Sequence, residues 1–203
     1  MPFSQTSNIY CVGRNYSGHI KELKSKTPEN PIFFHKPLFS LNASDEIIIP
    51  NDREVEHEVE VVVLIKKDGL AKNENEAKDF ICGYTLRIDI TDRKLQKNFK
   101  EKSTPWFLSK SFKGSAFVSK NIMDNLEEEF YLKINGEIKQ LGKSSEMIFS
   151  IERLIVYLSK FVALKRGDLI FTGTPSGVGK LSKKNIVEIG FSKNKNAEKY
   201  LVV

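Results

Sequence analysis

The stretch EVEHEVEVVVLI, residues 54–65, constrains the fold more than any other part of the chain. It places glutamates at positions 54, 56, 58 and 60 and then runs into five consecutive apolar residues, Val61–Ile65. Alternate residues of an extended chain share a face, so Glu58 and Glu60 are expected side by side, roughly 6 to 7 Å apart. The pattern alone fits two interpretations: a half-exposed strand with its glutamates in water, or a strand that presents carboxylates to a cation.

Length and composition predict one domain spanning residues 1–203. With 203 residues and 40% hydrophobic content, the chain can bury one well-developed core. Its longest apolar runs fall short of the roughly 20 residues that a membrane helix needs, and the amino terminus lacks the apolar core of a signal peptide. Cys11 and Cys82 have no CxxC spacing and are expected to be buried, reduced thiols. We therefore expect a soluble, cytoplasmic protein with no membrane partner.

The formal net charge of +6 raises the question of a nucleic-acid partner. The lysines are spread through the chain and are usually interleaved with Glu or Asp, which argues against nucleic-acid binding. A positive field also attracts small anionic substrates, so the charge is compatible with an enzyme that acts on acids.

The order of the expected elements indicates a β-rich α+β fold. Two or three helices are expected: His19–Lys26, a short helix from about Asn73, and 150–164, while 92–102 is helical or irregular. Asn135-Gly136 predicts a tight hairpin, because both turn positions need positive φ. The tail 192–203 is interpreted as an edge segment or a contact with a partner subunit. Strands are expected in 8–12, 31–37, 46–52, 57–65, 81–91, 130–142, 167–180 and 184–191.

Carboxylates from two strands could form a metal site. Asp89 lies in the strand GYTLRIDIT, and with Glu58 and Glu60 it would supply an oxygen-only ligand set of the kind that Mg²⁺ or Mn²⁺ prefers. His57 falls on the opposite face from the two glutamates and is not counted as a ligand.

Other residues carry weaker indications of chemistry. His19 and Glu22 are three apart in a helical segment, so the carboxylate could orient the imidazole or share a water with it, although this spacing is also common on surface helices. Lys36 and Lys110 interrupt apolar stretches, as lysines that reach into a cleft do, but a long stem with its charge in water explains the same pattern. The segment GTPSGVGK lacks the spacing of a phosphate loop, which excludes that mode of nucleotide binding.

Seven segments in one order resemble the fumarylacetoacetate hydrolase family, and especially its short acylpyruvase and oxaloacetate decarboxylase branch. The resemblance implies a mixed β-sandwich roll of the type of that family's C-terminal domain. It runs from about residue 8 to residue 191 and rests on CVGRNYSGHIKEL, HKP, HEVEVVVLI, GYTLRIDITDRKLQ, SKSF, INGEIKQ and GDLIFTGTPSGVG.

The resemblance also implies roles for individual residues. Glu58, Glu60 and Asp89 would bind one Mg²⁺, with Mn²⁺ or Ca²⁺ as substitutes, whereas Glu54 and Glu56 match no ligand position and are interpreted as solvent-facing. His19 and Glu22 would form a dyad on a lid of about residues 14–27, and Lys110 would be the active-site lysine. The implied substrate-binding positions are Arg14, Lys36, Arg93, Gln96 and Thr174.

The implied reaction is Mg²⁺-dependent hydrolysis of the C–C bond of acylpyruvates to pyruvate and a carboxylic acid, with oxaloacetate decarboxylation through the same enolate. The alternative is an isomerase or tautomerase that forms the enolate without C–C cleavage, of the oxaloacetate tautomerase or 2-hydroxyhepta-2,4-diene-1,7-dioate isomerase type. A non-catalytic binding protein is a third class, which the intact carboxylate set disfavours. A small anionic oxo acid and a second copy of the chain, in a homodimer, are the expected partners. The sequence departs from the family at Leu38 and Phe39, so substrate preference near that loop is left open.

Overall fold

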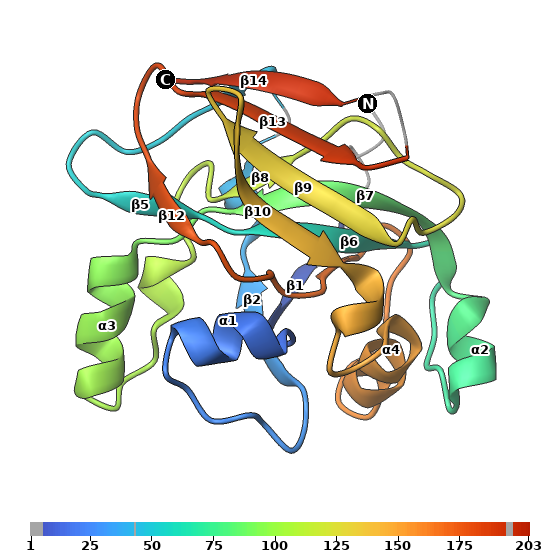
Figure 1. Cartoon of the computed structure of the whole chain (residues 1–203). Coiled ribbons are helices and arrows are strands. Elements are labelled where there is room, and N and C mark those ends of the chain that lie inside the picture. The colour runs from blue at the N-terminus through green and yellow to red at the C-terminus, as the bar shows by residue number, and fades with distance from the viewer. Residues whose placement is uncertain (1–5, 43, 194–196) are drawn as a thin grey trace.

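Two β-sheets carry most of the computed structural model, which describes residues 6–42, 44–193 and 197–203 (Figure 1). The first sheet has seven strands in the order β2-β1-β11-β6-β7-β8-β3, and the second has five in the order β10-β9-β13-β14-β4. A separate pair joins β12 to β5. This architecture confirms the predicted β-rich α+β fold.

The strands of the seven-stranded sheet are β1 (Ile9–Gly13), β2 (Ile32–Lys36), β3 (Leu41–Asn42), β6 (Val59–Ile65), β7 (Ile81–Asp89), β8 (Ala116–Val118) and β11 (Leu169–Phe171). Those of the five-stranded sheet are β4 (Glu46–Ile47), β9 (Glu129–Ile134), β10 (Glu137–Lys143), β13 (Ile186–Phe191) and β14 (Glu198–Val202). The remaining pair consists of β5 (Val55–His57) and β12 (Gly179–Leu181).

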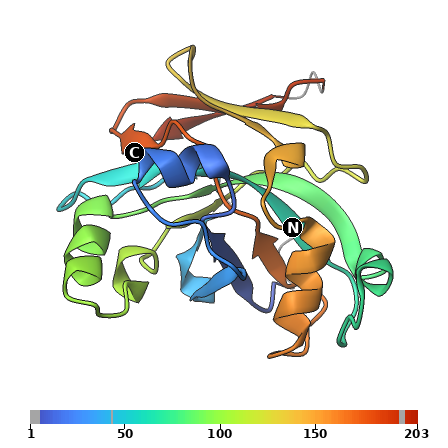
Figure 2. The same ribbon diagram turned by 60° about the horizontal axis from the view of Figure 1, so that its bottom comes forward.

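The four α-helices of the described residues lie below the two sheets in the view of Figure 1, and Figure 2 brings their side forward. Three of them begin at a side chain that accepts a hydrogen bond from the first turn: Asn73 before α2, Asp92 before α3 and Ser150 before α4. Short 3₁₀ turns occupy Leu38–Ser40, Phe107–Ser109 and Ser144–Glu146. The α-helices are α1 (Ser17–Glu22), α2 (Glu74–Lys78), α3 (Arg93–Glu101) and α4 (Ile151–Ser159).

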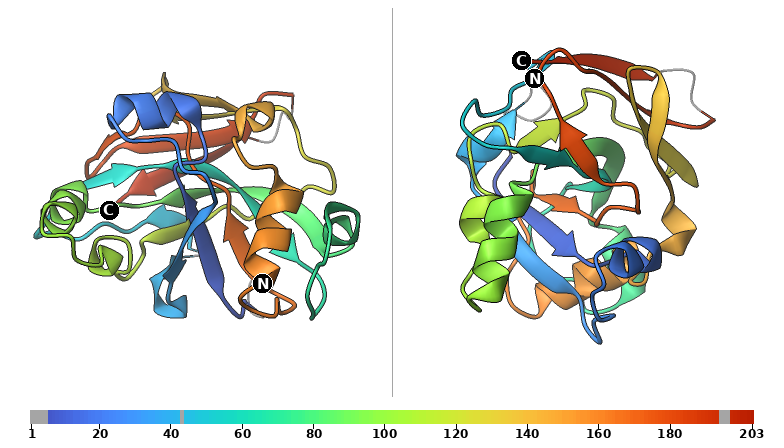
Figure 3. Two further views of the ribbon diagram at one scale, coloured as in Figure 1. Left: turned by 90° about the horizontal axis from the view of Figure 1, so that it is seen from below. Right: turned by 60° about the vertical axis from the view of Figure 1, so that its left-hand side comes forward.

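Strand β6 is buried along its whole length because both faces of the seven-stranded sheet are covered. Val61 and Val63 belong to the large core that includes Phe130 of the five-stranded sheet. Val62 belongs to a second apolar cluster on the other face. Since side chains alternate, Glu60 shares the face of Val62 and points away from the five-stranded sheet. The two layers are seen edge-on in the right-hand view of Figure 3.

Several expected boundaries were wrong. The helix expected over His19–Lys26 ends at Glu22, and Lys24 follows with a φ of 49°. The strand expected over 46–52 is only Glu46–Ile47 long. There are four α-helices in the described residues rather than two or three, because most of 92–102 is helical.

The carboxyl-terminal tail and one cysteine also differ from expectation. Strand β14 pairs with β13 on one side and β4 on the other, so it is not an edge strand, while residues 194–196 of that tail lie outside the described residues. Cys11 is buried as predicted, but Cys82 is exposed, and neither forms a disulfide with another described residue.

One further expectation holds. The hairpin turn has the predicted positive φ at Asn135 (52°) and Gly136 (88°). Among the residues described, none of the helices combines the length and the apolar character that crossing a membrane takes.

Candidate active site

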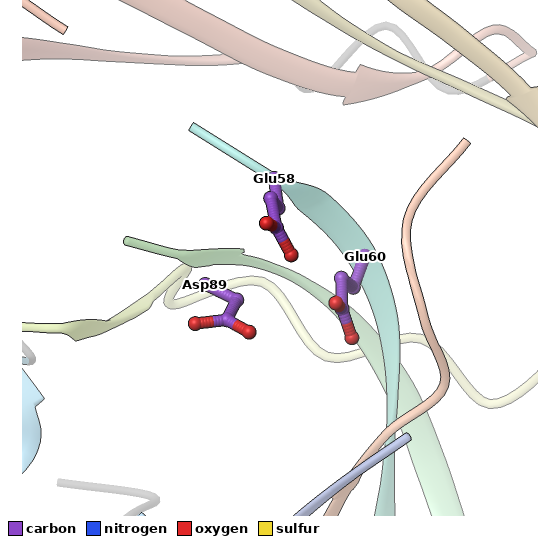
Figure 4. A group of neighbouring side chains, drawn as sticks. All are labelled: Glu58, Glu60 and Asp89. Atoms are coloured by element: carbon purple, nitrogen blue, oxygen red, sulfur yellow. The ribbon is translucent and has the colours of Figure 1, made fainter. Parts of the chain in front are cut away.

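Glu58, Glu60 and Asp89 converge at one point on the face of the seven-stranded sheet that lies away from the five-stranded sheet (Figure 4). One carboxylate oxygen from each lies within 4.8 Å of the others, and all three side chains are buried. The backbone N–H of Asp89 donates to the carbonyl of Glu58 at 2.9 Å, so the sheet itself sets their separation. The strand pairing thus produces the juxtaposition that the sequence pattern predicts.

Lys110 neutralises two of these carboxylates. Its ammonium donates to Oε2 of Glu58 at 2.8 Å, to Oδ2 of Asp89 at 2.7 Å and to Oγ1 of Thr91 at 2.6 Å. Burial favours the neutral form of Glu58, but the charges of Lys110 and Arg93 outweigh it and hold the pKa of Glu58 well below its usual range. Burial likewise opposes the charge of Lys110, and the carboxylates of Asp89 and Glu58 overcome it and raise the pKa of the lysine.

Glu60 lacks such compensation. Its Oε2 accepts the backbone N–H of Gly173 at 2.8 Å. Burial, followed by repulsion from Asp89 and Glu58, raises the pKa of Glu60 well above its usual range. Among the described residues, none donates a hydrogen bond of proper geometry to Oδ1 of Asp89, although Nζ of Lys36 lies 2.8 Å away. A buried all-oxygen set with an undercompensated carboxylate fits a hard divalent cation such as Mg²⁺ or Mn²⁺.

Lys36 lies behind this group rather than in the wall of the pocket. Its side chain is fully buried, and its ammonium faces Asp89 and donates to the carbonyl oxygens of Lys110 and, at 3.0 Å, Ser115. Lys36 is therefore not among the residues that line the pocket, and the substrate contact implied for it stays a prediction. The geometry assigns it to the support of Asp89 and of the backbone that carries Lys110.

Arg93 links helix α3 to the carboxylate group. Its guanidinium donates to Oε2 of Glu56 at 2.7 Å, to Oε1 of Gln96 at 2.7 Å and to Oε1 of Glu58. Glu56 is half-buried in this ion pair, so the expected solvent-facing role was wrong for it. That role holds for Glu54, which is exposed and pairs with Lys180.

His19 and Glu22 form a pair on helix α1. Nδ1 of His19 lies 3.1 Å from Oε2 of Glu22, and His19 is buried against the pocket. Oε1 of Glu22 accepts the backbone N–H of Gly177 at 3.0 Å, which ties the end of α1 to the Gly-rich turn after β11. His19 and Glu58 both line the pocket, so the pair and the carboxylate group share one site.

Thr174 belongs to a buried network that the sequence did not indicate. Its Oγ1 donates to the carbonyl of Val59 at 2.8 Å and accepts from Nε2 of Gln140 at 2.8 Å. Oε1 of Gln140 accepts the backbone N–H of Val59 at 3.0 Å and Nδ1–H of His57 at 2.8 Å. His57 thus faces away from the carboxylate group, as predicted, and helps to fix the strand that carries it.

A pocket opens over these groups. Eight of the eleven predicted site residues line it: Arg14, His19, Glu58, Glu60, Arg93, Gln96, Lys110 and Thr174. Of the other three, Asp89 and Glu22 contact lining residues directly, and Lys36 lies beneath. Lys100 and the aromatic pair Phe34 and Trp106 also line the pocket and were not predicted, although the spacing of Lys100 from Arg93 and Gln96 was a usable indication.

Comparison with known proteins identifies the family to which the chain belongs. Residues 8–200 match the model of the fumarylacetoacetate (FAA) hydrolase C-terminal family. The mouse protein named oxaloacetate tautomerase FAHD1, mitochondrial, is 44% identical over 190 residues, covering 90% of this chain and 86% of the mouse protein. The Dictyostelium discoideum protein named oxaloacetate decarboxylase, mitochondrial, is 40% identical over 192 residues, covering 91% and 88%.

A solved structure extends the comparison to the fold. The crystal structure of fumarylpyruvate hydrolase from Pseudomonas aeruginosa, in complex with Mn²⁺ and pyruvate, superimposes with a TM-score of 0.89 at 29% identity and covers 98% of this chain and 90% of that one. The predicted mixed β-sandwich roll is thereby confirmed. The family model covers nearly the whole chain, the two relatives are 44% and 40% identical to it, and the solved structure has the same architecture. The chain therefore belongs to the fumarylacetoacetate hydrolase family.

Proposed function

We propose that the protein is a metal-dependent enzyme that cleaves acylpyruvates, the 2,4-dioxo acids, into pyruvate and a carboxylic acid. The observation that carries the proposal is the meeting of a buried three-carboxylate group, Lys110 and the His19–Glu22 pair around one pocket. Carboxylate ligands, a buried cation and a base within reach are the parts that enolate chemistry needs.

The group that the carboxylates fit is a divalent cation. Mg²⁺ is the proposed ion, and the Mn²⁺ in the fumarylpyruvate hydrolase neighbour supports a cation of this kind. Held by Glu58, Glu60 and Asp89, it would act as a Lewis acid toward the 2-oxo oxygen of the substrate.

The residues of the chain divide the remaining work. The His19–Glu22 pair takes a proton from water, whose oxygen attacks the distal carbonyl carbon of the substrate. The C–C bond then breaks, its electron pair becomes the pyruvate enolate, and the proton is returned to carbon. Lys110 places positive charge where the enolate oxygen develops negative charge. Oε1 of Gln96 already accepts a hydrogen bond from Arg93, so the side-chain N–H groups of Gln96 are the part that donates to a substrate oxygen.

Oxaloacetate chemistry at the same site is the second candidate. The relatives named oxaloacetate tautomerase and oxaloacetate decarboxylase favour it. Decarboxylation forms the same enolate without an attacking water. Tautomerisation moves one proton between carbon and oxygen, and the His19–Glu22 pair could carry it.

The test is a comparison of two variants on two substrates. Glu22→Ala should slow acetylpyruvate cleavage on the order of 10² to 10⁴-fold, the usual range for a lost general base. Oxaloacetate decarboxylation should fall much less, whereas Glu58→Ala should remove both activities. Pyruvate release and enol disappearance are followed separately. Intact acetylpyruvate turnover in Glu22→Ala would refute the water-activating role, and enol–keto exchange without pyruvate release would identify a tautomerase.

Two further proposals concern the protein's setting. A homodimer is proposed from the family resemblance. The predicted cytoplasmic location stays a prediction, because the matched mouse and Dictyostelium proteins are named mitochondrial.

A further inference from the structure

We propose that Lys100 recognises a second carboxylate on the substrate, so that the pocket selects dicarboxylic oxo acids over acylpyruvates with an uncharged acyl group. The inference rests on the proposed function for the reacting end of the substrate and adds a specificity-determining residue for the other end.

Helix α3 presents one continuous face to the pocket. Arg93, Gln96 and Lys100 are three and four residues apart, hence on the same side of the helix, and all three line the pocket. Arg93 contacts Glu58 at the carboxylate group, and Lys100 lies at the rim two turns further along. Helical side chains lean toward the amino terminus. Accordingly, Nζ of Lys100 donates to Oε1 of Gln96 at 3.3 Å, which places the ammonium one turn closer to the reacting centre.

Lys100 lies among like charges. Burial, followed by repulsion from Arg93 and Arg14, lowers the pKa of Lys100 to about 8. In the part of the chain that the structure describes, no carboxylate lies within ion-pairing distance of its ammonium, whereas Arg93 and Lys110 each contact at least two acidic or amide oxygens. A cation held against other cations without its own anion is a position that an anionic ligand stabilises.

The charge balance of the whole site points to the same ligand. Five carboxylates, Glu22, Glu56, Glu58, Glu60 and Asp89, line the pocket or contact the residues that do. They are matched by five cations, Arg14, Lys36, Arg93, Lys100 and Lys110. A divalent cation bound to the three buried carboxylates leaves two positive charges in excess. A dianionic substrate cancels both, while a monoanion leaves one uncompensated.

Binding of two unreactive acids to the Mn²⁺-loaded protein tests the proposal by calorimetry. (S)-Malate and (S)-2-hydroxybutanoate share the 2-hydroxycarboxylate end and differ only in a distal carboxylate or methyl group. Malate should bind the wild-type protein more tightly. Lys100→Met should reduce that advantage about tenfold, the size of one charge-assisted hydrogen bond, and Lys100→Arg should retain it.

Lys97→Met is the matched control. Lys97 lies on the same helix but borders a separate hollow with Glu54 and Lys180, and its substitution removes the same charge. Equal losses in Lys97→Met and Lys100→Met, or a wild-type protein that does not prefer malate, would overturn the proposal. Failure of the proposed function is a different result from failure of this proposal. It would show as absent turnover of both acetylpyruvate and oxaloacetate by the wild-type enzyme, independently of the binding preference measured by calorimetry.

Discussion

Replacement of Gln140 by leucine should destabilise the protein by about 4 kcal/mol, although the residue carries no charge and does not line the pocket. Gln140 is 1% exposed and bonds four groups. Leucine of similar size would leave the backbone N–H of Val59 and Nδ1–H of His57 without an acceptor in a buried site. Burial lowers the pKa of His57, so its ring is neutral near pH 7 and cannot gain from protonation. An unsatisfied buried donor costs about 1 to 3 kcal/mol, and two give about 4.

Urea unfolding and a thermal melt measure the effect. For a chain of this length each kcal/mol shifts Tm by about 2 to 4 °C, so Gln140→Leu should lower Tm by about 10 °C. Lys139→Leu, at the adjacent partly exposed position of β10, controls for the added apolar side chain. A loss below about 1 kcal/mol in Gln140→Leu, or an equal loss in Lys139→Leu, would show that the network does not stabilise the strand that carries Glu58.

Four further predictions follow from the site and its surroundings. Glu60→Gln should weaken Mn²⁺ binding at least tenfold by calorimetry, since it removes one of three anionic ligands, and unchanged affinity would count against the carboxylate site. Gly177→Ala should reduce acetylpyruvate cleavage with little change in Mn²⁺ affinity. The φ of residue 177 is 93° and a Cβ there would collide with the carbonyl of Lys139, so the backbone would move and the hydrogen bond to Glu22 would be lost. Full activity would show that this hydrogen bond is not needed for cleavage. Hydrogen exchange over residues 14–27 should be fast without ligand and slow with malate and Mn²⁺, and slow exchange without ligand would contradict this expectation. Light scattering should give twice the 23.2 kDa mass of the chain, and the mass of one chain at micromolar concentration would contradict the dimer.

The strands and the carboxylate group could be predicted because each depends on local pattern. Residues 57–65 and 81–91 alternate or run apolar in the way that buried strands do, and the alternation itself places Glu58 and Glu60 on one face. The Asn135-Gly136 turn is equally local, since only a few residue types accept its positive φ.

The parts that the sequence did not indicate depend on partners distant in the chain. Gln140 lies in a strand whose sequence is typical of an exposed strand. The pairing of β10 with β9 shifts in register between Ile138 and Gln140, and the side chain of Gln140 is buried there. This shift depends on the pairing of the two strands, so the sequence of β10 alone does not show it. Glu56 reads as a solvent-facing glutamate until α3 brings Arg93 against it. Lys36 reads as a cleft lysine, and only the packed sheet shows that it passes beneath Asp89.

The contact between Glu22 and Gly177 is made by a main-chain amide, and this affects how the protein tolerates change. A side chain that held Glu22 could be lost by a single substitution, whereas an amide N–H is present in every residue except proline. The position of α1 is therefore encoded in the path of the chain through residues 172–179, which requires glycine at 177, rather than in a side chain that bonds Glu22. Substitutions at neighbouring surface positions can therefore accumulate without loss of the hydrogen bond to α1, provided that the backbone conformation next to Lys139 is unchanged.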